Sequence, residues 1–297
     1  MFLLFFCLKN NYLCSKIMEE TIITSVQNAR IKHVVALQQK SSLRREKGLF
    51  VVEGQREIEH CRACGYEIVE IFTRNDISWN VECGMWNEIT TFVTPQVYEK
   101  MAYRGSTEGV IAVAKCKDHS LSSLHILRQA KRQSRAPHST FHENNNPLIV
   151  VLESVEKPGN LGAILRSAEA SGVDAVIVCD PLTDMYNPNL IRASIGGVFC
   201  VPTAVCSSEE CIAFLKERGI SILTAQLQDS YEYYDYDMRS ATAIVMGTES
   251  TGLTDQWRQA ADAHIRIPML GRLDSLNVSV SAAILMYEAL RQRRSEK

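Results

Sequence analysis

The 297-residue sequence lacks the features that mark membrane-embedded, fibrous or strongly charged proteins. Its 32 basic and 34 acidic side chains leave a formal net charge of −2, so bulk charge gives no sign of a nucleic-acid partner. A local basic face would suffice to bind one. Hydrophobic residues make up 46% and charged residues 22%, which excludes collagen-like and largely disordered chains. The length predicts about two domains.

The ten cysteines show neither a disulfide framework nor the paired spacing of a zinc finger. Cys61 and Cys64 form a single C-x-x-C motif, for which a redox role is the alternative to two ordinary thiols. We expect small apolar thiols in a reducing cytoplasm, and no metal.

Two nucleotide-binding signatures are also missing. The chain contains neither G-x-G-x-x-G nor G-x-x-x-x-G-K-[ST]. These absences disfavour a dinucleotide oxidoreductase and a phosphate-loop nucleotidase.

The first 24 residues are expected to lie outside the folded domains. Residues 1–8 are apolar but reach only about half the length of a membrane span, and no cationic region precedes them. Met18 opens a sequence typical of a cytosolic start. Residues 1–17 are therefore interpreted as an extension from an upstream start.

Residues 25–116 predict a small mixed α/β domain. Residues 25–50 carry six basic side chains and one acidic side chain, a net +5, with apolar residues at helical spacing. Residues 117–147 are polar and predict a linker with a short helix at its start. After the basic stretch, we expect strands over 49–52, 68–72, 90–93 and 109–114, and a helix over 56–64.

Residues 148–297 alternate between apolar strands and helices. This order predicts an open, mostly parallel sheet, and ligands of such sheets bind at the carboxyl ends of the strands. We expect strands over 148–152, 174–178, 220–223 and 242–246, and helices over 161–170, 209–218 and 278–293.

Three loops at expected strand ends contain the candidate site residues. The first, 153–162, leads into a helix that we expect Asn160 to cap and that carries Arg166. The second is 247–253, and the third is 265–279. Each could be an ordinary capped turn. Their joint position at the ends of strands in one domain favours a shared site.

The three loops resemble the three motifs of the SpoU (TrmH-like) RNA 2'-O-ribose methyltransferases, which belong to the SPOUT superfamily. The N-terminal part resembles that family's ribosomal-protein-like substrate-binding domain through residues 50–54 and 109–113. The motif residues are Asn160-x-Gly162-x-x-x-Arg166-x-Ala168, then Gly247-x-Glu249-x-x-Gly252-Leu253, then Ile267-Pro268-Met269 with Ser275-Leu276-Asn277-Val278-Ser279.

The resemblance implies a trefoil-knotted domain that binds S-adenosylmethionine and works as a homodimer. It also implies that Gly247, Ile267 and Leu276 contact the cofactor and that Arg166 is the catalytic arginine. The residues that would organise the site around it are Asn160, Glu249, Ser275 and Asn277.

A guanidinium with a pKa above about 12 resists deprotonation. We therefore expect Arg166 to bind the adjacent phosphate and stabilise the developing alkoxide rather than act as a base. The expected substrate is tRNA or rRNA. The candidates for RNA contacts are the basic stretch with Arg44 and Arg45, the linker and the basic tail 291–297, and ordinary solvated faces are the alternative for each. A non-catalytic RNA-binding protein that retains the fold is the alternative, although intact Asn160, Arg166, Glu249 and Asn277 argue against it.

Overall fold

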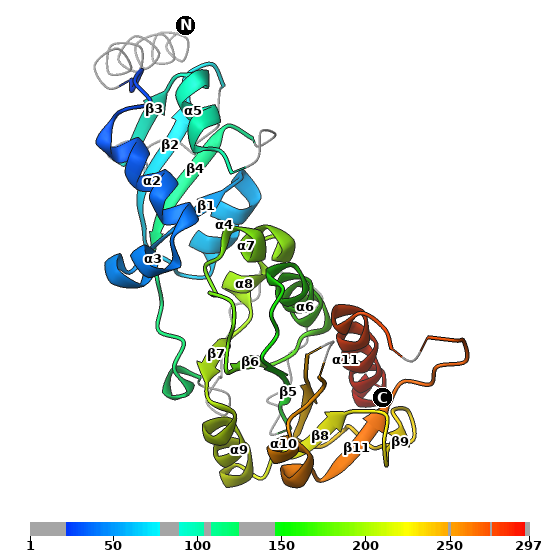
Figure 1. Ribbon diagram of the computed structural model, residues 1–297. Coiled ribbons are helices and arrows are strands. Elements are labelled where there is room, and N and C mark those ends of the chain that lie inside the picture. Colours follow the sequence, from blue (N-terminus) through cyan, green and yellow to red (C-terminus); the bar gives the residue numbers. More distant parts are fainter. Residues whose placement is uncertain are drawn as a thin grey trace, which may run out of the picture. The chain divides into compact units, whose positions relative to one another are not determined.

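The computed structural model describes residues 22–77, 89–103, 108–124, 146–248, 251–273 and 275–294 (Figure 1). The chain divides into two compact units, Met1–Lys117 and Asp118–Lys297. The proposed extension over residues 1–17 and most of the expected linker lie outside the described residues. Among the described residues, no helix has both the length and the apolar character needed to cross a bilayer.

The first unit is built on a four-stranded sheet of order β1-β4-β2-β3. Strand β4 pairs antiparallel with β1 and β2, and β2 pairs parallel with β3. The strands are β1 Leu49–Glu53, β2 Ile68–Arg74, β3 Thr90–Val93 and β4 Val110–Lys115. The helices are α2 Ala29–Gln39, α3 Ser41–Lys47, α4 Gln55–Ala63 and α5 Pro95–Met101.

The basic stretch near the start of this unit forms two helices. Ile31, Val34 and Leu37 of α2 are fully buried and pack against the sheet, as their helical spacing predicts. The backbone becomes extended at Lys40, which separates α2 from α3. Gly48, with a φ of +62°, then ends α3 and turns the chain into β1.

The second unit contains a seven-stranded sheet of order β7-β6-β5-β10-β8-β11-β9 in which every neighbouring pair is parallel, as expected. The strands are β5 Leu148–Glu153, β6 Ala175–Cys179, β7 Thr203–Cys206, β8 Ser221–Ala225, β9 Tyr231–Glu232, β10 Thr242–Met246 and β11 Ala263–Arg266. The helices are η1 Leu121–Ser123, α6 Pro158–Ser171, α7 Pro188–Ser194, α8 Gly197–Cys200, α9 Ser208–Glu217, α10 Asp255–Ala260 and α11 Val278–Arg294.

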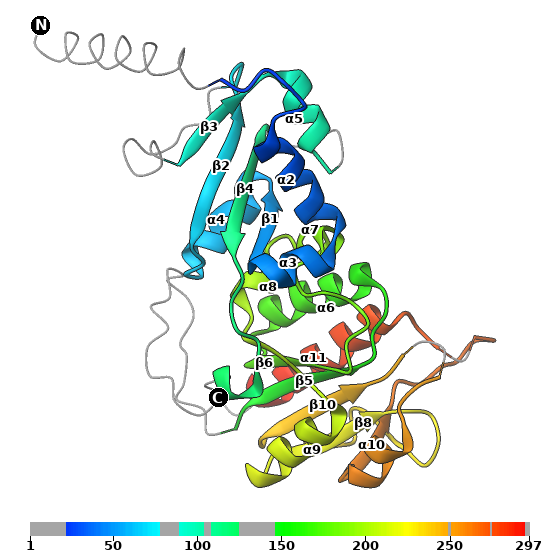
Figure 2. The same cartoon turned by 60° about the vertical axis from the view of Figure 1, so that its left-hand side comes forward.

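Helices cover both faces of this sheet, which explains why its central strands are apolar throughout. Helices α9 and α10 lie on one face, and α6 and α11 on the other (Figure 2). Alternate residues of β5 therefore enter different layers: Ile149 and Val151 join the core beneath α9 and α10, and Val150 and Leu152 are buried on the opposite side.

The start of the expected linker belongs to the second unit. His119 accepts a hydrogen bond from Val205 N at 2.7 Å through its backbone oxygen, and its Nδ1 lies 2.9 Å from Thr203 O. Leu124 is buried in the core beneath α9. The folded part of this unit therefore starts well before the 148 boundary expected from composition.

Candidate active site

The first and second loops leave the sheet side by side. Strands β5 and β10 are parallel neighbours, with Leu152 opposite Met246, so their carboxyl ends meet at the same edge. The third loop begins after β11, which β8 separates from β10. It returns toward β5, where Asn277 Nδ2 donates a hydrogen bond to Asn160 Oδ1 at 3.2 Å.

A cavity of about 100 Å³ lies where the three loops meet. All three contribute to it, the third through Val278 at the start of α11. Its lining residues are Val155, Glu156, Lys157, Asn160, Gly247, Thr248 and Val278.

A larger groove of about 360 Å³ follows the end of β11. Ile267 lines this groove rather than the small cavity, and Leu276 is 39% exposed. Of the three residues expected to contact the cofactor, the small cavity includes Gly247. The groove is lined by Leu227, Arg266, Ile267, Pro268, Met269, Gly271, Arg272 and Leu273.

The second loop is a tight turn that requires glycine at its start. A Cβ on Gly247 would lie 2.3 Å from the carbonyl carbon and oxygen of Gly252, a distance that no side chain tolerates. Gly252 N donates to Thr248 O at 3.1 Å, and Thr251 N donates to Thr248 Oγ1 at the same distance. Glu249 lies outside the described residues.

Helix α6 begins earlier than expected. Pro158 occupies its first turn and Lys157 the N-cap position, so the prediction that Asn160 caps the helix is wrong. Proline suits the first turn because its fixed φ is helical and its missing N–H would have no partner there. Asn160, in the first turn of the helix, accepts through its side-chain oxygen the hydrogen bond from Asn277 of the third loop.

Arg166 lies on the exposed side of α6, six residues after Asn160. At 1.5 Å per residue, the two Cα atoms are about 9 Å apart along the helix axis. Arg166 is not among the residues that line the small cavity. One turn before Arg166, α6 packs closely on α7, since a Cβ on Gly162 would lie 2.7 Å from Leu190 O.

Asn277 has two simultaneous contacts. Its Oδ1 accepts hydrogen bonds from Ser279 N at 3.0 Å and Ser279 Oγ at 2.6 Å, which fixes the start of α11. Its Nδ2 reaches Asn160. The capping interpretation is thus confirmed for this residue, and the same side chain also contacts the first loop. Ser275, in the same loop, is exposed.

Glu153 is a site residue to which the sequence interpretation gave no role. Its side chain is 2% exposed, and its Oε2 accepts a hydrogen bond from Thr254 N at 2.9 Å. Its Oε1 accepts from Thr254 Oγ1 at 2.7 Å and from Ser208 Oγ at 3.3 Å. The carboxylate therefore ties the end of β5 to the end of the second loop. The sequence signal that could have identified Glu153 is an acidic residue at the end of an otherwise apolar strand.

The basic residues do not all form an RNA-binding face. Arg44 is 3% exposed and donates from its guanidinium to the carbonyl oxygens of Leu37 and Gln38, which corrects its assignment to RNA binding. Arg45 is exposed. In the tail, Arg293 donates to Ser240 O at 2.6 Å and to Met238 O at 2.9 Å, so this arginine also serves the fold.

Cys61 of the C-x-x-C pair does not have the character of a reactive thiol. Burial raises the pKa of Cys61 to about 12, and the neighbouring Cys64 adds to the increase. Reactive cysteines instead have a lowered pKa, because the thiolate is the nucleophile. Cys61 therefore has the character of an ordinary buried thiol.

Comparison with known families agrees with the positions of the three loops. Residues 147–287 match the SpoU rRNA Methylase family, and residues 28–112 match the MRM3-like substrate binding domain. A Staphylococcus epidermidis protein named as a TrmH family tRNA/rRNA methyltransferase is 35% identical over 164 residues, which are 55% of this chain and 63% of that protein. The chain spans 59 to 63% of the length of this and two further staphylococcal relatives.

Solved structures extend the similarity to both units. A crystal structure of an RNA 2'-O ribose methyltransferase has 35% identity and a TM-score of 0.73, covering 92% of this chain and 99% of that one. The AdoMet-bound rRNA methyltransferase from Sinorhizobium meliloti has 25% identity and a TM-score of 0.76, with coverages of 91% and 97%.

Proposed function

Since the chain belongs to the SpoU methylase family, we propose that it transfers a methyl group from S-adenosylmethionine to a ribose 2'-hydroxyl of rRNA or tRNA. The similarity to an RNA 2'-O ribose methyltransferase over nearly the whole of both chains supports the reaction class. The match of residues 28–112 to a substrate-binding domain supports an RNA substrate.

The observation that carries the proposal is the convergence of the three motif loops on one cavity at the carboxyl edge of the sheet. The hydrogen bond between Asn277 and Asn160 joins the third loop to the first. Ordinary capped turns would not need this convergence. A transfer reaction does need it, because fixed alignment of two reactants can contribute about 7–11 kcal/mol.

The residues around the cavity and the groove suit S-adenosylmethionine. Gly247 presents bare backbone to the cavity, and Ile267 with Met269 gives the groove apolar walls beside backbone polar groups. When bound, this cofactor supplies a methyl group on a sulfonium. We propose that Gly247, Ile267 and Leu276 hold it, largely through backbone groups. The AdoMet-bound state of the Sinorhizobium meliloti relative is consistent with this proposal.

We propose that Arg166 binds an RNA phosphate and stabilises the developing alkoxide. Its exposed position on α6 leaves it accessible to RNA. A charge-assisted hydrogen bond from a guanidinium to a phosphate is short and can be bidentate. Asn160 and Asn277 position the loops around the reacting hydroxyl, and Glu249 and Ser275 complete the proposed set. We also propose a cytoplasmic homodimer with a trefoil knot, as the family resemblance implies.

The test is methyl transfer from labelled S-adenosylmethionine to deproteinised total RNA and to isolated ribosomal subunits, followed by digestion to nucleosides. We expect label in a 2'-O-methylnucleoside for the wild-type protein and none for Arg166→Ala. Arg258→Ala, which changes an exposed arginine on α10, serves as the matched control and should retain transfer. Label on a base, or equal transfer by Arg166→Ala, would overturn the proposal. Cofactor binding without transfer to either substrate would favour the RNA-binding alternative.

A further inference from the structure

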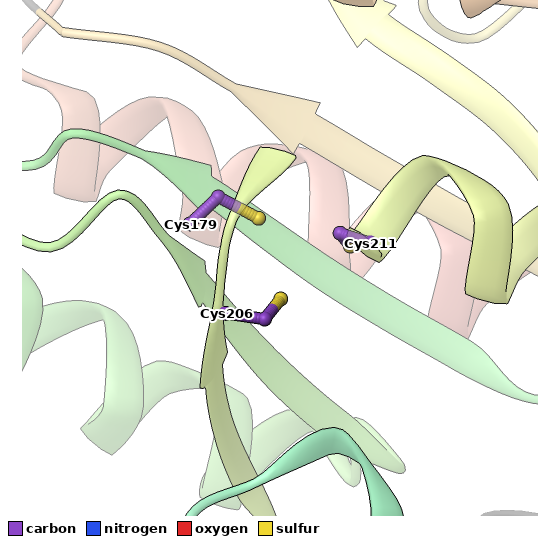
Figure 3. A group of neighbouring side chains, drawn as sticks. All are labelled: Cys179, Cys206 and Cys211. Atoms are coloured by element: carbon purple, nitrogen blue, oxygen red, sulfur yellow. The ribbon is translucent and has the colours of Figure 1, made fainter. Parts of the chain in front are cut away.

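Three cysteines far apart in the sequence gather at one edge of the second unit. Cys179 ends β6, Cys206 ends β7, and Cys211 lies in the first half of α9. Their sulfur atoms all lie within 4.8 Å of one another. Figure 3 shows the sulfurs of Cys179 and Cys206 pointing into the space that Cys211 faces. The three are free thiols.

Regular features of the fold hold the three thiols in place. Strands β6 and β7 are parallel neighbours, and Cys179 and Cys206 are register partners. A capping box then fixes the start of α9: Glu210 N donates to Ser207 Oγ at 3.1 Å, and Ser207 N donates to Glu210 Oε2 at 2.8 Å. This start orients Cys211 toward the strand ends. The cluster is therefore pre-organised by backbone pairing.

The burial and the charges of the cluster favour a bound cation. Cys179 and Cys211 are fully buried, whereas Cys206 is partly exposed and gives access from solvent. The carboxylates of Glu210 and Asp180 add negative potential near this thiol.

The spacing of the sulfurs is that of a thiolate metal site. A Zn–S bond is about 2.3 Å, so two sulfurs on one zinc ion are about 3.8 Å apart in a tetrahedral site and about 4.0 Å apart in a trigonal one. The three sulfurs are at most 4.8 Å apart, so shifts below about 1 Å would bring them to these separations. Three thiolates select soft cations over hard ones.

We propose that Cys179, Cys206 and Cys211 form a binding site for a soft, thiophilic cation, with zinc as its ligand. Binding of Zn²⁺ to three thiols forms three Zn–S bonds and releases up to three protons to solvent, leaving a site with a net charge of −1. A water molecule on the side of Cys206 completes four-coordination. This site departs from our expectation of no metal, which rested on sequence spacing alone.

Such an ion would brace the edge of the sheet next to the active-site loops. Strand β7 is the outermost strand on this side, and the cluster joins it to β6 and α9. Ser208, next to the cluster, donates its hydroxyl proton to Asp180 Oδ2 at 2.6 Å, and the same Oγ lies 3.3 Å from Glu153 Oε1. The site is thus structural and separate from the proposed methyl-transfer site, and its test does not depend on that activity.

The test is titration of the reduced full-length protein with Cd²⁺ and with Zn²⁺. Cadmium reports thiolate ligation through its ultraviolet charge-transfer band, and zinc affinity is measured calorimetrically against a competing chelator. We expect one tight equivalent in the wild-type protein. Cys206→Ser and Cys211→Ser should lower that affinity by about 100-fold or more, since even loss of an outer-shell partner costs about 10–100-fold. Cys64→Ser, in the first unit, is the matched control and should bind like the wild type.

Zinc should also raise the thermal unfolding temperature of the wild-type protein and of Cys64→Ser, but not that of Cys206→Ser. Circular dichroism establishes that each variant is folded before titration. Equal zinc affinity of the wild type and Cys206→Ser would overturn the proposal. A loss of zinc affinity in Cys64→Ser as large as the loss expected for Cys206→Ser would also overturn it. A Cys–Cys disulfide within the cluster that persists in reductant and blocks cadmium uptake would also overturn it.

Discussion

Replacing Glu153 tests whether a buried carboxylate holds the end of β5 to the second loop. Thr254 N donates to Glu153 Oε2, and the hydroxyls of Thr254 and Ser208 donate to Oε1. In Glu153→Leu, the Thr254 N–H loses its carboxylate acceptor in a part-buried setting. In Glu153→Gln, the amide oxygen can still accept from Thr254 N, and the two hydroxyls can rotate to accept from the new NH₂ group.

The expected size of the effect follows from these contacts. A hydrogen bond to a charged group contributes about 1.5–3 kcal/mol. Ser208 keeps Asp180 Oδ2 as its acceptor, and the exposed Thr254 recovers part of its loss with water. We therefore expect Glu153→Leu to lower the free energy of unfolding of the second unit by about 2–3 kcal/mol. Glu153→Gln should lower it by about 1 kcal/mol.

Urea unfolding measures both values, and Glu209→Leu supplies the control because its carboxylate is exposed on α9. That control should change the unfolding free energy by no more than about 0.5 kcal/mol. Methyl transfer at a temperature where all variants are folded should fall in the order wild type, Glu153→Gln, Glu153→Leu. If Glu153→Leu unfolded with the same free energy as Glu209→Leu, the reasoning from these hydrogen bonds would be refuted.

Four further substitutions test individual residues of the site and the proposed RNA-binding residues. Gly247→Ala should destabilise the fold by about 1–3 kcal/mol and abolish cofactor binding measured by calorimetry, because its Cβ would overlap the backbone of Gly252; unchanged binding would refute the packing argument. Arg166→Lys should lower turnover by roughly 10²-fold, since an ammonium cannot reproduce a bidentate guanidinium contact; full turnover would exclude both the phosphate role and the base role. Arg45→Ala should reduce the slope of log RNA affinity against log salt by about 1 without changing the melting temperature. Arg44→Ala should lower the melting temperature and leave that slope unchanged. A lower slope with an unchanged melting temperature would show that Arg44 binds RNA.

The strands were predictable because the sheet of the second unit is buried on both faces. Residues 242–246 read as an apolar and β-branched run and form β10 with the predicted bounds. A fully covered parallel strand needs apolar residues at every position, and this pattern is visible in sequence. The loops that follow such strands could therefore be placed correctly at strand ends.

Short helices and the partners of polar groups were not predictable in the same way. Helices α7 and α8 are brief and are separated by Ile195, whose φ of +51° breaks the periodic pattern. Arg44 reads as a surface charge, yet the carbonyl groups at the end of α2 need donors, and its guanidinium supplies them. A side chain that satisfies backbone groups on another helix leaves no periodic signal.

The two contacts that assemble the proposed active site are also non-local, and both involve the same segment of chain. Glu153 and Thr254 are 101 residues apart, and Asn160 and Asn277 are 117 residues apart. The first pair ties the first loop to the second, and the other pair ties it to the third. The segment from β5 into α6 is therefore the common support of both other loops. Strand order placed these residues together, and strand order is a property of the fold that local sequence patterns do not contain. A shift of α6 would consequently disturb the second and third loops together, even where no side chain of the cavity changes.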